Sequence, residues 1–167
     1  MPDTSITPYV SVTQITGERY GYKFSCLLID TRNRRVYIPN TQGALIRPSD
    51  LAKQTGAIIA MNASAWTKVP PYRAQGLTVS DGQIYEPYTR QPYLNVTREG
   101  AVQIKTGVSD DWYNAFSGFR FLIVDGVIQE YLKGSEIQYT ERHPRSLWGV
   151  HRDGRLINLS IEGRMET

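Results

Sequence analysis

The chain has 167 residues, of which 40% are hydrophobic and 21% charged, so it is long enough to bury its own core and we expect one domain spanning residues 1–167. Its formal net charge of +3 suits a small anionic ligand, but it is far below the charge of a protein that binds duplex nucleic acid. No stretch is apolar enough to span a bilayer and no export signal opens the chain, so we expect a cytoplasmic protein without a membrane partner.

The first third of the chain shows mostly strand patterns. Segments that alternate or run apolar, with β-branched and aromatic residues, predict strands at 9–16, 22–31 and 35–39. Residues 48–55 read as a short helix that Ser49 caps and Gly56 ends. The apolar run 57–61 that follows predicts a strand buried on both faces.

From residue 75 onward, four acid–glycine pairs each lie between two strand-like segments. Such pairs favour tight hairpin turns, because those turns need positive φ angles. The pairs are Asp81 with Gly82, Glu99 with Gly100, Asp125 with Gly126, and Asp153 with Gly154. The predicted fold class is therefore α+β, with mostly antiparallel β-hairpins around a mixed sheet and one or few short helices.

Three longer irregular segments, 63–75, 86–92 and 106–120, separate the hairpins and carry aromatic and arginine side chains. Loops of this length are often functional, and rings such as those of Trp66 and Tyr88 suit stacking on a sugar or a base. The alternative is that these side chains cover the edges of the sheets.

Both histidines of the chain lie in the basic stretch 142–155. Arg142 and Arg145 flank His143, and Pro144 restricts His143 to an extended conformation, which stiffens the segment. Paired arginines match phosphate, and a histidine can transfer a proton near neutral pH. The alternative is that His143 caps a strand and the arginines are solvated, whereas His151 is expected to be structural.

Five segments in chain order resemble the motifs of the phosphodiester glycosidase family. They read IIAMNASAW (58–66), GLTVSDG (76–82), NAFSGFRFLIVDG (114–126), RHPRSLWG (142–149) with a later DG, and IEGR (161–164). The resemblance covers roughly residues 55–164. It departs from the family pattern at Ala63 and Ser64, which replace glycines, at Arg120, which replaces a proline, and at Glu162, which replaces an aspartate. A glycine-rich motif that completes the family's site is also missing.

The resemblance implies that the chain hydrolyses a phosphodiester. Asn62 would bond phosphate or sugar (the alternative is that it ends a strand in a turn), and backbone N–H groups with a hydroxyl at Ser117 and Gly118 would hold an oxyanion. Arg120 is either a phosphate contact or a surface residue. We expect His143, Glu162 and Arg145 to be catalytic, and Asn62, Ser117, Gly118, Arg120, Arg142, Arg164, Trp66 and Tyr88 to bind the ligand.

The bond that breaks is left open by the sequence. Cleavage at the sugar C1–O bond normally needs two carboxyl groups, and only Glu162 is an evident candidate. Cleavage at P–O needs positive charge and a base, which the arginines, His143 and Glu162 can supply. No residue spacing indicates zinc and no cofactor is expected, although a divalent ion held by loop carboxylates stays open.

The first functional hypothesis is a hydrolase of a soluble phosphodiester, either a sugar-1-phosphodiester or a cyclic nucleotide-type messenger, in a phage-encoded counter-defence role. The missing glycine-rich motif favours an alternative, a binding protein that sequesters a phosphorylated or nucleotide ligand without cutting it. A third reading is a module of a larger phage assembly. An open sheet edge is also compatible with a homo-oligomer.

Overall fold

The computed structural model describes residues 3–6, 12–32, 34–118, 120–130 and 143–163. The contacts divide the chain into two compact units: unit 1 comprises Met1–Arg34 and Arg120–Thr167, and unit 2 comprises Arg35–Phe119. The expectation of a single domain stays a prediction. Among the described residues, no helix is long and apolar enough to cross a membrane.

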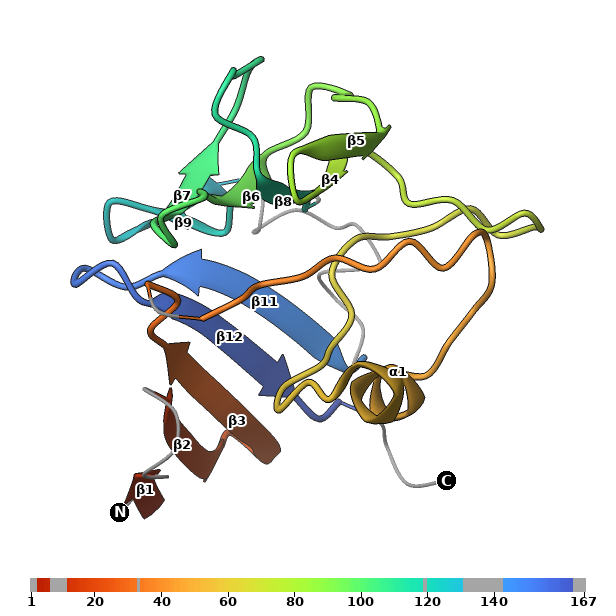
Figure 1. Cartoon of the computed structure of the whole chain (residues 1–167). Helices are drawn as coiled ribbons and strands as arrows, with labels where there is room; N and C mark the ends of the chain where they lie inside the picture. Colours follow the sequence, from red (N-terminus) through yellow and green to blue (C-terminus); the bar gives the residue numbers. More distant parts are fainter. Residues whose placement is uncertain (1–2, 7–11, 33, 119, 131–142, 164–167) are drawn as a thin grey trace. The chain divides into compact units, whose positions relative to one another are not determined.

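Unit 1 contains a five-stranded sheet with the strand order β1-β2-β3-β12-β11 (Figure 1). Every strand pair in it is antiparallel. The central strand β3 pairs with β2 on one side and with β12 on the other. The strands of this unit, including the separate exposed hairpin β9–β10, are β1 (Asp3–Ile6), β2 (Val12–Arg19), β3 (Tyr22–Ile29), β9 (Ile123–Val124), β10 (Val127–Ile128), β11 (Arg145–Val150) and β12 (Leu156–Ile161).

Unit 2 contains a second five-stranded sheet with the order β5-β4-β8-β6-β7, together with helix α1. Its core is formed by Leu77, Val79, Tyr93 and Ala115, against which Tyr88 and Trp112 pack. The elements are α1 (Pro48–Thr55), β4 (Thr78–Ser80), β5 (Gln83–Glu86), β6 (Tyr93–Val96), β7 (Val102–Lys105) and β8 (Asn114–Ser117).

The α+β class with few helices is confirmed, as are all four turns predicted from acid–glycine pairs. Asp81 and Gly82 adopt φ angles of 47° and 80° between β4 and β5, which is the left-handed backbone that such a turn requires. The same holds for Asp125 at 49° in the β9–β10 hairpin. The pairings in the described part are antiparallel throughout, so the expected mixed sheet is not observed there.

Two predicted strands are wrong. Residues 35–39 form no ladder, and Arg35 instead donates a 2.8 Å hydrogen bond to the carboxylate of Asp81. Residues 57–61 are irregular, and Ile58 is 70% exposed rather than buried. A segment with high strand propensity forms a strand only where a neighbouring strand offers free backbone groups. No described strand pairs with either segment.

The helix at 48–55 is confirmed, but its expected cap is not. Arg47 is the N-cap residue and no side chain caps the helix, because Pro48 at the first helical position starts the helix before Ser49. Gly56 ends the helix in the left-handed conformation, with φ of 67°, and its N–H bonds to the carbonyl of Ala52.

Candidate functional site

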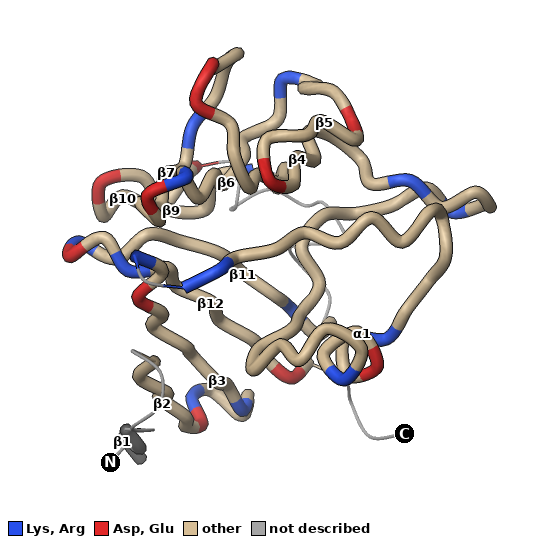
Figure 2. Tube along the Cα trace, in the orientation of Figure 1, with Lys and Arg blue, Asp and Glu red and all other residues tan. Residues whose placement is uncertain are grey.

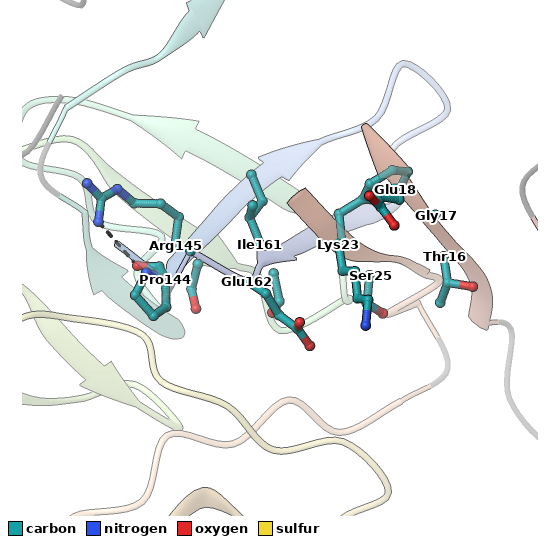
Figure 3. A pocket seen from close by; sticks show the side chains of 13 residues that line it. Thr16, Gly17, Glu18, Lys23, Ser25, Pro144, Arg145, Ile161 and Glu162 are labelled. Carbon is teal, nitrogen blue, oxygen red and sulfur yellow. Dashed lines mark hydrogen bonds between the residues drawn. The ribbon is translucent and has the colours of Figure 1, made fainter. Parts of the chain in front are cut away.

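A cavity of about 840 Å³ lies in unit 1, at one end of its sheet (Figure 3). Three parts of the sheet line it: the β2–β3 hairpin, the start of β11 and the end of β12. Two residues predicted to be catalytic, Arg145 and Glu162, lie in its wall. The fold therefore brings the RHPR and IEGR motifs to the same cavity.

The side chains of Arg145 and Glu162 leave the sheet on opposite sides. Arg145 pairs directly with Ile161, so the two side chains share a face, and Glu162 is the next residue along. Figure 3 shows Ile161 pointing to one side of the sheet, and Lys23, Ser25 and Glu162 to the other. Lys23 is therefore a positive group on the face of Glu162.

Gly163 is the point at which the two motifs touch. It is buried, and a Cβ atom at this position would overlap the carbonyl group of His143 and come within 2.9 Å of the nitrogen of Pro144. Because glycine has no side chain, the backbone segment that follows β12 can lie against the segment that precedes β11. This contact holds Glu162 next to the segment that carries Arg145.

His143 itself is exposed and is not part of the cavity wall. Arg145 donates a hydrogen bond of 3.3 Å from Nη1 to the carbonyl oxygen of Pro144. Arg142 and Arg164, both predicted to bind the ligand, lie outside the described residues. Arg120 belongs to unit 1 and is exposed.

Ser117 and Gly118 belong to unit 2, where their backbone N–H groups are already used. Ser117 donates to the carbonyl of Leu77 and Gly118 to that of Pro92, each at 2.9 Å. Both N–H groups are thus bonded to backbone carbonyls, and the assignment of Ser117 and Gly118 to the ligand stays a prediction. The Ser117 hydroxyl is buried without a hydrogen-bond partner among the described residues, and it keeps its place as a candidate.

The remaining candidates also lie in unit 2. Asn62 is exposed in the irregular segment after the helix, so it does not end a buried strand. Trp66 is 48% exposed and available for stacking. Tyr88 is half-buried, and the centroid of its ring lies 5.8 Å from that of Tyr93. Its hydroxyl accepts a 2.6 Å hydrogen bond from the N–H of Gly107. These contacts give Tyr88 a role in the packing of unit 2.

The cavity contains charged side chains that sequence reasoning missed. Glu18 and Lys23 lie on the β2–β3 hairpin, well before the family-like motifs. The sequence did contain a signal for Glu18: side chains alternate between the two faces of a strand, so Gln14, Thr16 and Glu18 share one face of β2. Only the pairing of β3 with β12 shows that this face meets Glu162.

A second charged group lies at the β11–β12 turn, where Figure 2 shows both signs close together. The carboxylate of Asp153 accepts a 2.9 Å hydrogen bond from Nε of Arg155 and lies 2.8 Å from Nδ1 of His151. These partners, Arg155 first, hold the pKa of Asp153 well below its usual range. In the same unit, hydrogen bonds from Arg32 lower the pKa of Asp30 to about 2.

Among the residues that the structure describes, no group of three or more His, Cys, Asp or Glu side chains is placed to hold a metal ion.

The fold and the cavity indicate a small α+β protein with a mixed acidic and basic site. The model of the phosphodiester glycosidase family matches residues 55–167, about two thirds of the chain. The chain therefore belongs to the phosphodiester glycosidase family, and the resemblance seen in its motifs is confirmed. No curated protein matches the chain.

Proposed function

We propose that this protein is a hydrolase that cleaves a small, soluble phosphodiester, with a sugar-1-phosphodiester as the first candidate substrate. The observation that carries this proposal is the cavity of unit 1, whose wall contains Glu162 and Arg145 from two family motifs. A carboxyl group and cations beside one cavity suit a substrate that has a sugar carbon to be attacked and a phosphate to be neutralised.

The two ends of a sugar-1-phosphodiester make different demands on the site. The phosphate leaves as an anion, so a positive side chain such as Lys23, on the face of Glu162, stabilises the developing charge. At the sugar carbon, the oxocarbenium-like transition state needs carboxyl groups. We therefore favour cleavage of the C1–O bond, with Glu162 as one of the carboxyl groups.

A panel of substrates tests the proposed function. The protein is incubated with methyl phosphodiesters of hexose-1-phosphates and N-acetylhexosamine-1-phosphates, and with cyclic dinucleotides, in water enriched in oxygen-18. Cleavage of C1–O places the label in the sugar and leaves an unlabelled phosphomonoester, whereas cleavage of P–O places it in the phosphate. Mass spectrometry of products separated by chromatography distinguishes the two.

Variants then test the residues assigned from the motifs. We expect His143→Ala and Arg145→Ala each to lower kcat/KM by about 10²-fold or more, as for groups that transfer protons or bind phosphate in the transition state. The control is Lys53→Ala, on the exposed side of α1 in unit 2. If both site variants keep full activity, their assignment is wrong.

A binding protein is the alternative outcome of the same experiment. In that case the ligand stays intact, co-purifies with the protein and is released on denaturation. If no small ligand is cleaved or bound, and a stable complex with another protein forms, the chain is an assembly module rather than a hydrolase.

A further inference from the structure

We propose that Glu18 is the second carboxyl group of this site and that Lys23, between Glu18 and Glu162, binds the phosphoryl group of the substrate. This inference rests on the proposed function and extends the site to the first hairpin of the chain, which lies outside the family match at 55–167. It supplies the second carboxyl group that sugar C1–O cleavage requires.

Strand register places the three residues in one row. Glu18 is directly opposite Lys23 in the β2–β3 pair. On the other side of β3, Ile161 is opposite Phe24, and the N–H of Glu162 donates a 2.9 Å hydrogen bond to the carbonyl oxygen of Lys23. The order across the three adjacent strands is therefore Glu18, Lys23, Glu162.

Directly opposed residues of antiparallel strands share a face of the sheet, so the three side chains leave the sheet on the same side. All three are exposed and line the cavity (Figure 3). The next row on this face consists of hydroxyl side chains from four neighbouring strands, Thr16, Ser25, Ser160 and Ser146. Hydroxyls that can donate and accept are suitable partners for a sugar or for phosphate oxygens.

The charged side chains of this row form no ion pairs with other described side chains. Among the described residues, neither carboxylate nor the Lys23 ammonium takes part in an ion pair. Elsewhere the chain does pair its charges, as in Lys105 with Asp111 at 2.8 Å. The three exposed side chains, in the order Glu18, Lys23, Glu162, are therefore available to a ligand that enters the cavity.

The spacing of the strands that carry Glu18 and Glu162 favours one of two mechanisms. Adjacent strands lie about 4.8 Å apart, so the backbones of Glu18 and Glu162, two strands apart, are separated by roughly 9 to 10 Å. Retaining glycosidases need carboxyl groups about 5 Å apart, whereas inverting enzymes separate them by about 6.5–9.5 Å to admit a water molecule. Side chains that leave the sheet in parallel keep about this separation, so the row is closer to the inverting arrangement than to the retaining one. Lys23 lies between the two glutamates, where it can meet the departing phosphate.

The step balances with water as the only co-reactant. One carboxylate takes a proton from water while the water oxygen forms a bond to C1. The C1–O bond to phosphate breaks, its electron pair stays on the bridging oxygen, and the other carboxyl group gives that oxygen a proton. The products are the free sugar, inverted at C1, and a phosphomonoester whose charge Lys23 offsets. Solvent then returns the two carboxyl groups to their starting protonation states.

The test uses the full chain with a sugar-1-phosphodiester that the wild-type protein cleaves. Glu18→Ala and Glu162→Ala are each expected to lower kcat by about 10³-fold or more, whereas Glu99→Ala, on an exposed hairpin of unit 2, leaves it unchanged. Sodium azide restores turnover in the variant that lacks the base, and the product is a glycosyl azide of inverted configuration. Lys23→Met raises KM, and circular dichroism confirms that each variant is folded.

Proton NMR of the first product anomer formed by the wild-type protein gives an independent readout. Inversion of configuration at C1 supports the proposed arrangement of Glu18, Lys23 and Glu162, and retention of configuration contradicts it. If the wild type is active and Glu18→Ala keeps that activity, this inference fails while the proposed function stands. If the wild type cleaves no sugar phosphodiester, both proposals fail together.

Discussion

At the residue scale, Gly163 shows how an unremarked position can organise a site. Its φ angle is not in the left-handed region, so the turn chemistry of glycine does not explain it. The reason is close approach: the His143 carbonyl occupies the space of a Cβ atom. The glycine of the IEGR motif is thus explained by the position of the RHPR motif.

We predict that Gly163→Ala destabilises the protein by about 1–3 kcal/mol, because the added methyl group must displace backbone rather than a flexible side chain. Urea unfolding followed by circular dichroism measures the change. The control is Gly149→Ala in β11, where a Cβ atom would lie 3.6 Å from Ile157, an ordinary contact. Equal stability of the two variants would show that the His143 segment moves freely.

A second prediction at this scale concerns acid stability. Arg32 lowers the pKa of Asp30 to about 2, compared with about 3.9 in an unfolded chain. A carboxyl group with a lowered pKa stabilises the fold above pH 4, and this contribution is lost as the pH falls toward 2. The urea midpoint of Asp30→Asn should therefore vary less between pH 5 and pH 2 than that of the wild type.

Arg32→Gln is the matched variant, because it removes the partner and leaves the carboxyl group. It should flatten the same pH profile, and both differences should shrink at high salt, since the pair is exposed to solvent. Profiles parallel to that of the wild type would contradict the assignment of this pair.

At the scale of elements, an aromatic cluster joins strands and loops of unit 2. Tyr88, Tyr93 and Trp112 lie with ring centroids 5.8–6.2 Å apart, in edge and tilted arrangements. Tyr93 comes from β6, while the other two come from irregular segments. The cluster therefore fixes both segments against the sheet, and it explains why Tyr88 is half-buried.

The hydroxyl groups of this cluster lead to a paired prediction. Tyr88→Phe removes the bond from Gly107 and should cost about 0.5–1.5 kcal/mol. Tyr93→Phe removes a buried hydroxyl that has no partner among the described residues, so stability should be unchanged or higher. Thermal unfolding of the two variants is the measurement, and the opposite ranking would contradict the cluster as described.

At the scale of the whole molecule, the sheet of unit 1 is built from both ends of the chain. β12 pairs with β11 on one side and with β3 on the other. The family match, at 55–167, includes β11 and β12 but not the first three strands. Those strands supply Glu18 and Lys23 to the cavity.

We predict that a fragment of residues 55–167 does not form the sheet of unit 1. Without β3, β11 and β12 are left as a two-stranded hairpin with an unpaired edge, which is marginal in water and prone to associate. Circular dichroism and sedimentation should show lost strand signal or aggregation. A soluble, folded and active fragment would show that the first hairpin is dispensable, and it would also exclude Glu18 from catalysis.

The sequence by itself determined the local features of this protein. Acid–glycine pairs predicted turns correctly because the glycine of each pair adopts a positive φ, and Gly56 ended the helix for the same reason. Family membership was also readable, because ordered motifs survive even where single residues differ. Strand propensity failed at 57–61, because a strand exists only when a neighbour completes its hydrogen bonds.

Only the tertiary structure decided which distant residues share a face. The sequence named Glu162 and Arg145 together, but the register puts their side chains on opposite sides of the sheet. It also brings Lys23 beside Glu162, more than a hundred residues away. The physical reason is that β3 and β12, which pair through backbone hydrogen bonds, are far apart in the sequence, so local patterns do not set their register. A shift of that register by one residue would turn every side chain to the other face.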